Sequence, residues 1–242
     1  MKSWSKAVVR SSGSDRVLVI MAKAPRAGTV KTRLAPSLTP SAITALYRCL
    51  LEDTLTLAQS LRDVDVAIMC PQPDKDELAQ LAGNRAAIVA QKGEGLAAGL
   101  AFVFDHFAKD RRRTIAFNSD SPHLPSSALE NAFETLAKHD LVVGPTHDGG
   151  YYLVGAKASH ATLFARDGMG TSSALQRLLS HAQSLKLSVG FAETFYDVDI
   201  AEDLTRLAGE LRSNPERAPR TATWLKQWEQ AATQLRTGTA QL

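Results

Sequence analysis

Residues 24–33 form a polar loop whose side chains could bind phosphate. The loop contains Gly28, Lys31 and Arg33 and follows a long apolar run. A glycine lets backbone amides approach an anion, while lysine and arginine neutralise phosphate charge, the latter as a bidentate fork. The order of strand, glycine loop, cations and helix favours phosphate binding over a merely solvated basic loop. The loop is not a P-loop, because Val30 precedes the lysine where that motif has glycine.

Carboxylates follow two later apolar runs and could bind a divalent cation. Asp120 lies just beyond the run 114–118, where it could hold Mg²⁺ beside substrate phosphates or could merely begin a turn. Asp197 and Asp199 alternate along a later run, so both side chains would share one face of a strand. The competing interpretation makes Asp199 an N-cap paired with Glu202, which still leaves one carboxylate oxygen for a metal. A metal role for Asp199 therefore remains open in either case.

Two glycine-containing segments are weaker candidates. Asp148, Gly149 and Gly150 most simply form a tight turn, although the glycines could also leave room for a ligand beside the carboxylate. Residues 93–98, GEGLAA, satisfy the dinucleotide fingerprint, which would make the protein an NAD-dependent oxidoreductase. That fingerprint normally opens its domain, whereas two predicted strand–helix units precede it here. We therefore disfavour the oxidoreductase alternative.

These polar segments interrupt a regular alternation of apolar strands and amphipathic helices. The first long helix, for example, has Ile43, Tyr47, Leu50 and Leu51 on one face. Such alternation is typical of βαβ units and predicts a three-layer α/β/α sandwich around a mainly parallel, Rossmann-like sheet. Predicted strands lie at 16–23, 64–70, 86–90, 114–118, 141–144, 187–192 and 195–198, with one more after the turn at 147–150. Predicted helices lie at about 43–58, 94–109, 126–138 and 171–183, and another begins at 201.

The composition is that of an ordinary globular protein. Of the 242 residues, 44% are hydrophobic and 22% are charged, which excludes a collagen-like or coiled-coil protein. We interpret residues 1–15 as a disordered basic tail, 16–213 as a single α/β domain and 214–242 as a C-terminal helical extension packed on that domain.

Charge and cysteine content narrow the expected partners and location. A net charge of +3 arises from 28 Lys+Arg against 25 Asp+Glu, and no basic patch is interleaved with aromatics, so we expect no nucleic-acid binding. The two cysteines lack metal-ligand spacing, which favours a reduced, cytoplasmic setting. No apolar run reaches the roughly 20 residues of a membrane span. A G-x-S-x-G elbow is also missing, so a hydrolase has no support.

Four segments, taken together, resemble one bacterial family. They are VLVIMAKAPRAGTVKTRLAP at 17–36, FNSDSPHLP at 117–125, VVGPTHDGGYYLVG at 142–155 and DVDIAEDL at 197–204. They resemble a domain-of-unknown-function group of the glycosyltransferase-A-like, or nucleotide-diphospho-sugar transferase, superfamily, some members of which are labelled arsenosugar-biosynthesis glycosyltransferases. The first segment is also similar to the guanylyltransferase of deazaflavin cofactor biosynthesis, and the last to molybdenum-cofactor-type nucleotidyltransferases. The resemblance spans 16–210 and implies a nucleotide-binding transferase domain of glycosyltransferase-A type.

The resemblance also implies which residues bind the nucleotide. Gln91 and Gly93 would contact the nucleoside, although residues 91–99 read QKGEGLAAG where the family often has Q-x-G-D-L-G-E-R-M. That departure leaves the preferred base and acceptor open. The implied nucleotide-binding residues are Ala24, Pro25, Gly28, Lys31, Arg33, Gln91, Gly93, Asp148, Gly149 and Gly150.

The implied catalytic groups are Lys31, Arg33 and Asp120, with Asp120 and Asp199 holding Mg²⁺ or Mn²⁺ across the donor phosphates. Two reactions of a nucleotide or nucleotide-sugar donor with a small acceptor fit these groups. The cationic loop and the single strand-end Asp120, which has no D-x-D pair at that position, favour nucleotidyl transfer from a nucleoside triphosphate. The family label favours glycosyl transfer instead. A nucleotide-binding protein without catalytic activity is the third hypothesis.

Overall fold

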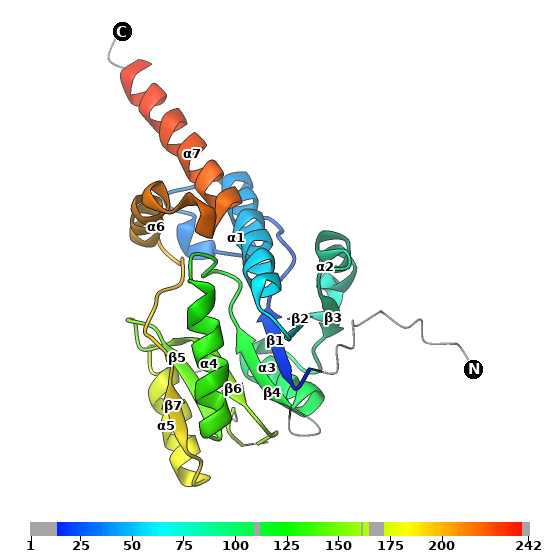
Figure 1. Cartoon of the computed structure of the whole chain (residues 1–242). Helices are drawn as coiled ribbons and strands as arrows, with labels where there is room; N and C mark the ends of the chain where they lie inside the picture. The colour runs from blue at the N-terminus through cyan, green and yellow to red at the C-terminus, as the bar shows by residue number, and fades with distance from the viewer. Residues whose placement is uncertain (1–13, 109–111, 161, 165–171, 239–242) are drawn as a thin grey trace, which may run out of the picture.

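The computed structural model describes residues 14–108, 112–160, 162–164 and 172–238 (Figure 1). Most of the predicted tail, 1–13, lies outside the described residues. The described strands form a seven-stranded sheet in the order β3-β2-β1-β4-β6-β5-β7, in which only β6 runs antiparallel to its neighbours. The strands are β1 (Arg16–Met21), β2 (Asp65–Cys70), β3 (Ala87–Ala90), β4 (Arg113–Phe117), β5 (Leu141–Pro145), β6 (Tyr151–Ala156) and β7 (Val189–Phe191).

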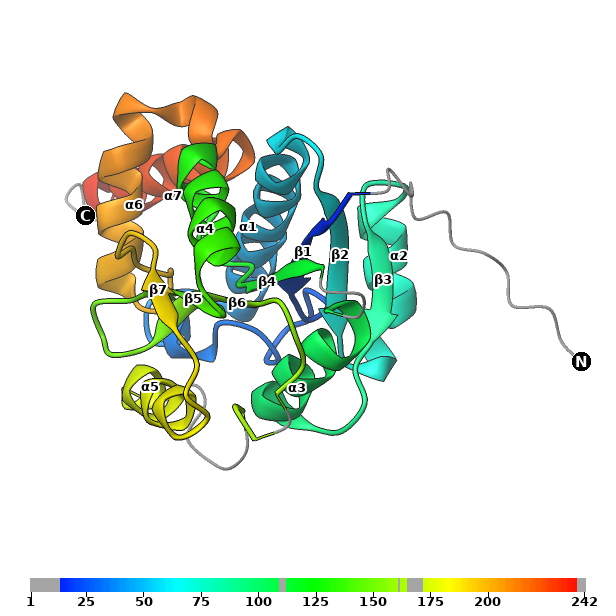
Figure 2. The ribbon, with the colours of Figure 1, turned by 60° about the horizontal axis from the view of Figure 1, so that its bottom comes forward.

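Helices cover both faces of the sheet, as the predicted three-layer sandwich requires (Figure 2). Along β1, Leu18 and Ile20 point into one apolar core, whereas Val17 and Val19 point into the other. Helices α1, α2 and α4 pack on the first face, and α3 and α5 on the second. The helices are α1 (Pro40–Ser60), α2 (Lys75–Ala82), α3 (Gly95–Phe107), α4 (Ser126–Lys138), α5 (Ala174–Ser184), α6 (Ala201–Ser213) and α7 (Pro219–Gly238).

The strand order reverses between β1 and β4. The chain runs outward from β1 through β2 to β3 and then returns to place β4 against the other side of β1. Loops that leave the carboxyl ends of two such strands diverge and leave a crevice, which is the usual ligand site of open α/β sheets. The loop after β1 carries Lys31 and Arg33, and the loop after β4 carries Asp120. The fold thus brings the predicted cations and the predicted carboxylate to the same edge of the sheet.

One predicted strand is wrong. Residues 195–198 contribute only an isolated bridge between Phe195 and Thr146, and the sheet ends at β7. The segment is nevertheless extended, with Tyr196 and Val198 buried in a third apolar cluster against α1 and α6. One buried side produces the same apolar–polar alternation as a strand does, so the pattern alone cannot distinguish the two. The oppositely directed residues, Asp197 and Asp199, are more exposed.

The C-terminal helices pack on the outer side of α1. Leu207 of α6 and Leu225 of α7 join the third apolar cluster. The buried carboxylate of Asp53 in α1 accepts hydrogen bonds from Thr221 N and Thr221 Oγ1, both 2.8 Å long, at the first turn of α7. This carboxylate satisfies amide donors that the helix start cannot pair internally. Beyond these contacts, α7 projects away from the body (Figure 1).

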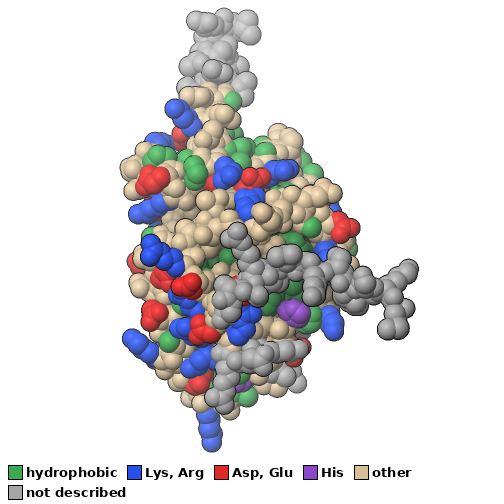
Figure 3. All heavy atoms as spheres, turned by 45° about the vertical axis from the view of Figure 1, so that its right-hand side comes forward, with side chains coloured by type: hydrophobic (Ala, Val, Ile, Leu, Met, Phe, Trp, Pro, Cys, Tyr) green, Lys and Arg blue, Asp and Glu red, His purple; other side chains and the backbone are tan. Residues whose placement is uncertain are grey.

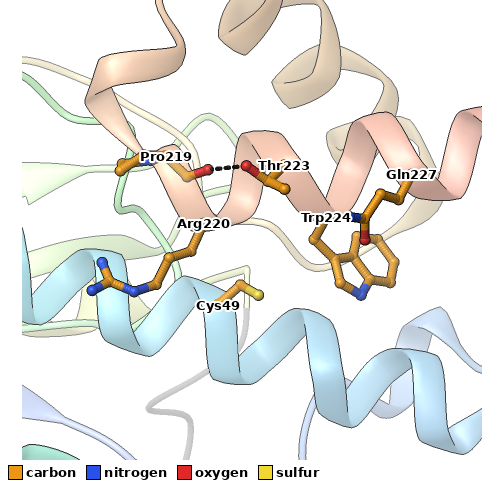
Figure 4. Close-up of a pocket in the computed structure, with 6 residues that line it drawn as sticks. All are labelled: Cys49, Pro219, Arg220, Thr223, Trp224 and Gln227. Atoms are coloured by element: carbon orange, nitrogen blue, oxygen red, sulfur yellow. Dashed lines mark hydrogen bonds between the residues drawn. The ribbon is translucent and has the colours of Figure 1, made fainter.

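An open hollow of about 610 Å³ lies between α1 and α7 (Figure 4). Cys49, Arg220 and Trp224 are among its lining residues, and the guanidinium of Arg220 pairs with Asp53. Cys49 is two residues from Tyr47 on α1, and residues at that spacing point to nearly opposite sides of a helix. The hollow is therefore separate from the crevice that Tyr47 faces.

On the face shown in Figure 3, basic and acidic side chains are interspersed rather than gathered into one basic field. None of the described helices combines the length and the apolarity that crossing a bilayer requires.

Candidate active site

Lys31 lies at the centre of the crevice. Its Nζ contacts Asp120 Oδ2 and lies 2.6 Å from Asp199 Oδ1, and only 6% of its side chain is exposed. Burial alone would lower the pKa of this ammonium, but the charges of both carboxylates outweigh burial and raise the pKa above its ordinary value. The backbone at Lys31 is left-handed, with φ 47°, and the buried side chains of Val30 and Leu34 anchor the loop around it. The lysine is therefore held charged and in place.

Three carboxylates meet around this ammonium. Oxygen atoms of Asp120, Asp197 and Asp199 lie within 4.8 Å of one another. Burial, followed by the charges of Asp120 and Asp199, raises the pKa of Asp197 to about 6. The sequence predicts Asp120 and Asp199 as the metal ligands and presents Asp197 only as one member of an alternating pair. The sequence feature that could have identified Asp197 as a ligand is the D-x-D spacing in an extended segment.

Backbone contacts between two loops bring these carboxylates together. Ser121 Oγ donates to Tyr196 O at 3.0 Å, and Val198 N donates to Asp120 O at 3.3 Å. The loop after β4 and the extended segment before α6 are thereby joined side by side. The fold thus places Asp120 and Asp199 side by side although they lie far apart in the sequence.

The capping interpretation of Asp199 needs correction. Ile200 is the N-cap of α6, and Asp203, not Glu202, supplies the capping carboxylate. Asp203 Oδ2 accepts from the amides of Asp199 and Ile200, each at 2.9 Å. The Asp199 side chain therefore takes no part in the cap and faces Lys31 instead. Capping still fixes the backbone from which this carboxylate projects.

Arg33 and the turn at Asp148 border the crevice. Arg33 Nη1 lies 3.4 Å from Asp199 Oδ2, and its side chain is 65% exposed, so it remains accessible to a ligand. Asp148 Oδ1 accepts from Thr146 Oγ1 and from Gly150 N. The Thr146 bond is the main cause that lowers the pKa of Asp148, and the positive charge of Arg33 contributes to the shift. The turn is thus preorganised and electrostatically coupled to Arg33.

The other predicted nucleotide-binding residues make structural contacts. Ala24 N donates to Asp74 Oδ2 at 2.9 Å, and Pro25 is buried. Gln91 Nε2 donates to the carbonyls of Gly93 and Gly95 at 3.1 and 3.3 Å, which braces the loop before α3. This loop follows the edge strand β3, away from the switch between β1 and β4, so it does not fit the dinucleotide fingerprint. A role for Gln91 and Gly93 in nucleoside binding stays a prediction.

Sequence comparison identifies guanylyltransferases as relatives. A model of the family described as "Uncharacterized protein conserved in bacteria (DUF2064)" matches residues 54–171. The 2-phospho-L-lactate guanylyltransferase of Methanothermobacter thermautotrophicus is 29% identical over 178 residues, which are 72% of this chain and 76% of the relative. The phosphoenolpyruvate guanylyltransferase of Sphaerobacter thermophilus is 27% identical over 187 residues, or 76% of this chain and 89% of the relative.

Structural comparison agrees with the predicted fold. A protein of Desulfovibrio desulfuricans, assigned as a nucleotide-diphospho-sugar transferase, superposes with a TM-score of 0.81 at 25% sequence identity. The match covers 91% of this chain and 98% of the other. Similarity over nearly the whole of both chains confirms the glycosyltransferase-A-type fold expected from the sequence.

Proposed function

We propose that this chain, a transferase of the nucleotide-diphospho-sugar transferase superfamily, transfers a nucleotidyl group from a nucleoside triphosphate to a small acceptor with the aid of a divalent metal. The observation that carries this proposal is the buried ammonium of Lys31 between Asp120 and Asp199 at the switch point. A fixed cation beside clustered carboxylates suits a triphosphate, because both can share the negative charge that develops as pyrophosphate leaves.

The carboxylates fit Mg²⁺ or Mn²⁺ by their chemistry. Both ions prefer oxygen ligands, and Asp120, Asp197 and Asp199 together offer such oxygens. Burial and mutual repulsion raise the pKa of Asp197, which indicates more negative charge than Lys31 alone balances. When bound, the ion would supply Lewis-acid stabilisation of the phosphate charge.

The remaining chemistry would fall to Lys31, Arg33 and the loop at Gly28. The loop amides and the Arg33 guanidinium would orient the triphosphate, and the Lys31 ammonium would face the departing oxygens. An acceptor oxygen forms a bond to the α-phosphorus, and the bond from that phosphorus to the bridging oxygen breaks. The electron pair of the broken bond leaves on pyrophosphate, where a lysine ammonium is a suitable partner.

The names of the relatives suggest the donor and the acceptor. Both are guanylyltransferases, one acting on 2-phospho-L-lactate and the other on phosphoenolpyruvate. We extend this to GTP as donor and to a small phosphorylated carboxylic acid as acceptor. A phosphate acceptor carries a nucleophilic oxygen that is already ionised near pH 7, so its attack needs no separate general base.

Glycosyl transfer is the second candidate. It is supported by the likeness to a protein assigned as a nucleotide-diphospho-sugar transferase and by the D-x-D spacing of Asp197 and Asp199. In that reaction the acceptor would attack the sugar carbon and a nucleoside diphosphate would leave. A nucleotide-binding protein without turnover is the third candidate.

A ligand panel followed by product analysis separates these candidates. Thermal shifts with nucleoside triphosphates and nucleotide sugars, each with and without Mg²⁺, identify the donor, because a ligand at 100 times its Kd stabilises by about 2.7 kcal/mol. Phosphorus NMR with GTP, Mg²⁺ and either 2-phospholactate or phosphoenolpyruvate should then show pyrophosphate and a new diphosphate linkage. Release of a nucleoside diphosphate from a nucleotide sugar would contradict the nucleotidyl assignment.

Matched carboxylate variants test the site itself. Asp120→Asn should lower turnover at least 100-fold and remove the Mg²⁺-dependent part of nucleotide binding without loss of the fold. Asp105→Asn, an exposed acid on α3, is the control and should behave as the wild type. Equal nucleotide affinity with and without Mg²⁺ in the wild type would refute the metal assignment.

A further inference from the structure

A row of hydrogen bonds runs from the start of the β1–α1 loop to Asp120. Lys23 N donates to Tyr47 Oη at 3.2 Å. Tyr47 Oη lies 3.0 Å from Ser119 Oγ, which in turn donates to Asp120 Oδ1 at 3.0 Å. Tyr47 and Ser119 are only 4% and 3% exposed. Two buried hydroxyls therefore connect the backbone of the Lys31 loop to a carboxylate of the candidate site.

The direction of these bonds follows from counting protons. A hydroxyl has a single proton, and Ser119 gives its proton to Asp120. Tyr47 must therefore be the donor to Ser119, while its oxygen accepts from Lys23 N. Burial, with a contribution from the charge of Asp120, raises the pKa of Tyr47 to about 12, so this donor keeps its proton near neutral pH. Bonds aligned in one direction polarise one another.

The row fixes which oxygen of Asp120 faces the ammonium. Oδ1 accepts from Ser119, and Oδ2 contacts Lys31. The backbone of Ser119 is itself held, because the single proton of Thr54 Oγ1 is shared between the carbonyl oxygens of Leu50 and Ser119, which lie 2.8 and 3.2 Å away. The side chains of Tyr47 and Thr54, both on α1, thus brace the residue that orients the carboxylate.

We propose that Tyr47 is a positioning residue for the transfer reaction: acting through Ser119, it holds Asp120 in register with the loop that carries Lys31. This inference rests on the proposed function, because the role of Asp120 in the transfer reaction is itself part of that proposal. Because Tyr47 is buried, its role would be exercised through Ser119 and Asp120 rather than by contact with the substrate. Groups of this kind, which orient a ligating or reacting side chain, typically change activity or metal affinity by about 10–100-fold.

Two variants and their combination test the proposal. Ser119→Ala removes the bond to Asp120 and should lower kcat by about 10–100-fold, whereas Tyr47→Phe leaves Ser119 free to rotate and should lower kcat by about 10-fold. KM for the nucleotide should stay close to the wild-type value in both. Because the two substitutions interrupt the same row, the double variant should resemble Ser119→Ala alone. Fully additive effects on kcat would overturn the proposal.

Thr221→Val is the matched control. It also removes a fully buried hydroxyl with a hydrogen-bond partner, but it lies at the start of α7. Its Tm should fall as in Tyr47→Phe, while its kcat should not change. If Thr221→Val and Tyr47→Phe lowered kcat equally, a merely structural role would explain Tyr47.

Crystal structures of the two variants provide a measurement that needs no turnover. We expect the Asp120 carboxylate to be rotated and its Oδ2 to have lost contact with Lys31 Nζ. An unmoved carboxylate in both variants, together with wild-type activity, would overturn the positioning role. If the wild-type protein transfers no nucleotidyl group, the proposed function fails, and the orientation of Asp120 in the variants still decides whether Tyr47 positions it.

Discussion

Lys31 combines a left-handed backbone with a buried, charged side chain. A φ of 47° is costly for a residue with a Cβ, and the ammonium is removed from water. Both costs are offset by contacts with Asp120 and Asp199. Strain and burial that converge on one residue in a crevice are typical of a functional site, because packing alone would not require a lysine there.

We expect Lys31→Met to destabilise the metal-free protein and to make it more responsive to divalent cations. Removing one partner of a buried ion pair costs roughly 3–5 kcal/mol, and partial exposure of the carboxylates should reduce this to about 2 kcal/mol. Three carboxylates without a counter-ion should then bind Mg²⁺ more tightly. Chemical denaturation across a Mg²⁺ titration measures both effects. A smaller Mg²⁺-dependent gain in stability than in the wild type would contradict this view.

His123 predicts an acid-dependent loss of stability. It is 2% exposed and packs against Tyr196, with no hydrogen-bond partner for either ring nitrogen among the described residues. Burial is the main cause that lowers its pKa from 6.5 to about 4; the charges of Arg206 and Arg217 add to this, and Glu210 opposes it.

Below pH 6.5 the unfolded chain therefore binds a proton that the folded chain still rejects. The free energy of unfolding should be unaffected by His123 above that pH and should fall by about 3 kcal/mol as the pH decreases to 4. His123→Leu should lack this component. Denaturation curves at pH 7, 5.5 and 4 measure the difference, and a constant gap between the wild type and His123→Leu across this range would refute the prediction.

At the scale of elements, apolar runs were sufficient to predict the strands of the sheet, because a strand buried on both faces leaves a continuous signal. The segment 195–198 is the exception. Alternation of apolar and polar residues indicates that one side of a segment is buried, but it does not indicate that the backbone is hydrogen-bonded to a neighbouring strand. The approach of Lys31 and Asp120 follows from the rule that sites lie beyond strand ends. Asp199, in contrast, follows a segment that is extended but is not a strand of the sheet. Tyr47 was recognised only as one member of an apolar stripe, and nothing in the sequence shows that its hydroxyl is bonded.

The turn at Gly149 gives a prediction about an element boundary. Its φ is 88°, and a Cβ there would overlap the carbonyl oxygen of Ser172, just before α5. Gly149→Ala should therefore lower the free energy of unfolding by about 1–3 kcal/mol. Gly209→Ala is the control, because Gly209 is an exposed position of helix α6 where a Cβ would meet nothing within 4 Å, and the substitution should stabilise by about 0.5–1 kcal/mol. Equal effects of the two substitutions on the urea midpoint would contradict this argument.

At the scale of the molecule, the site depends on two layers of packing. The sheet brings the loops after β1 and β4 together, and the third apolar cluster holds the segment that carries Asp197 and Asp199 against α1 and α6. Leu225 of α7 belongs to the same cluster. We therefore propose that the C-terminal helix and the α/β body unfold together, which goes beyond the packed helical extension that the sequence predicts.

Asp53 offers a way to test that cooperation. Its buried carboxylate accepts from the backbone and side chains of Arg220 and Thr221, so Asp53→Ala leaves the start of α7 uncapped. A lost cap costs about 1 kcal/mol. Trp224 and Trp228 lie on α7, so in a Trp4→Phe background tryptophan fluorescence follows its docking, while far-ultraviolet circular dichroism follows the whole fold. The two transitions should coincide in the wild type and separate in Asp53→Ala.

Glu52→Ala is the control, because it removes only a partly exposed partner of Arg220, and the two transitions should still coincide in this variant. Separate transitions in the wild type would show that α7 unfolds as an independent unit and would contradict the proposal.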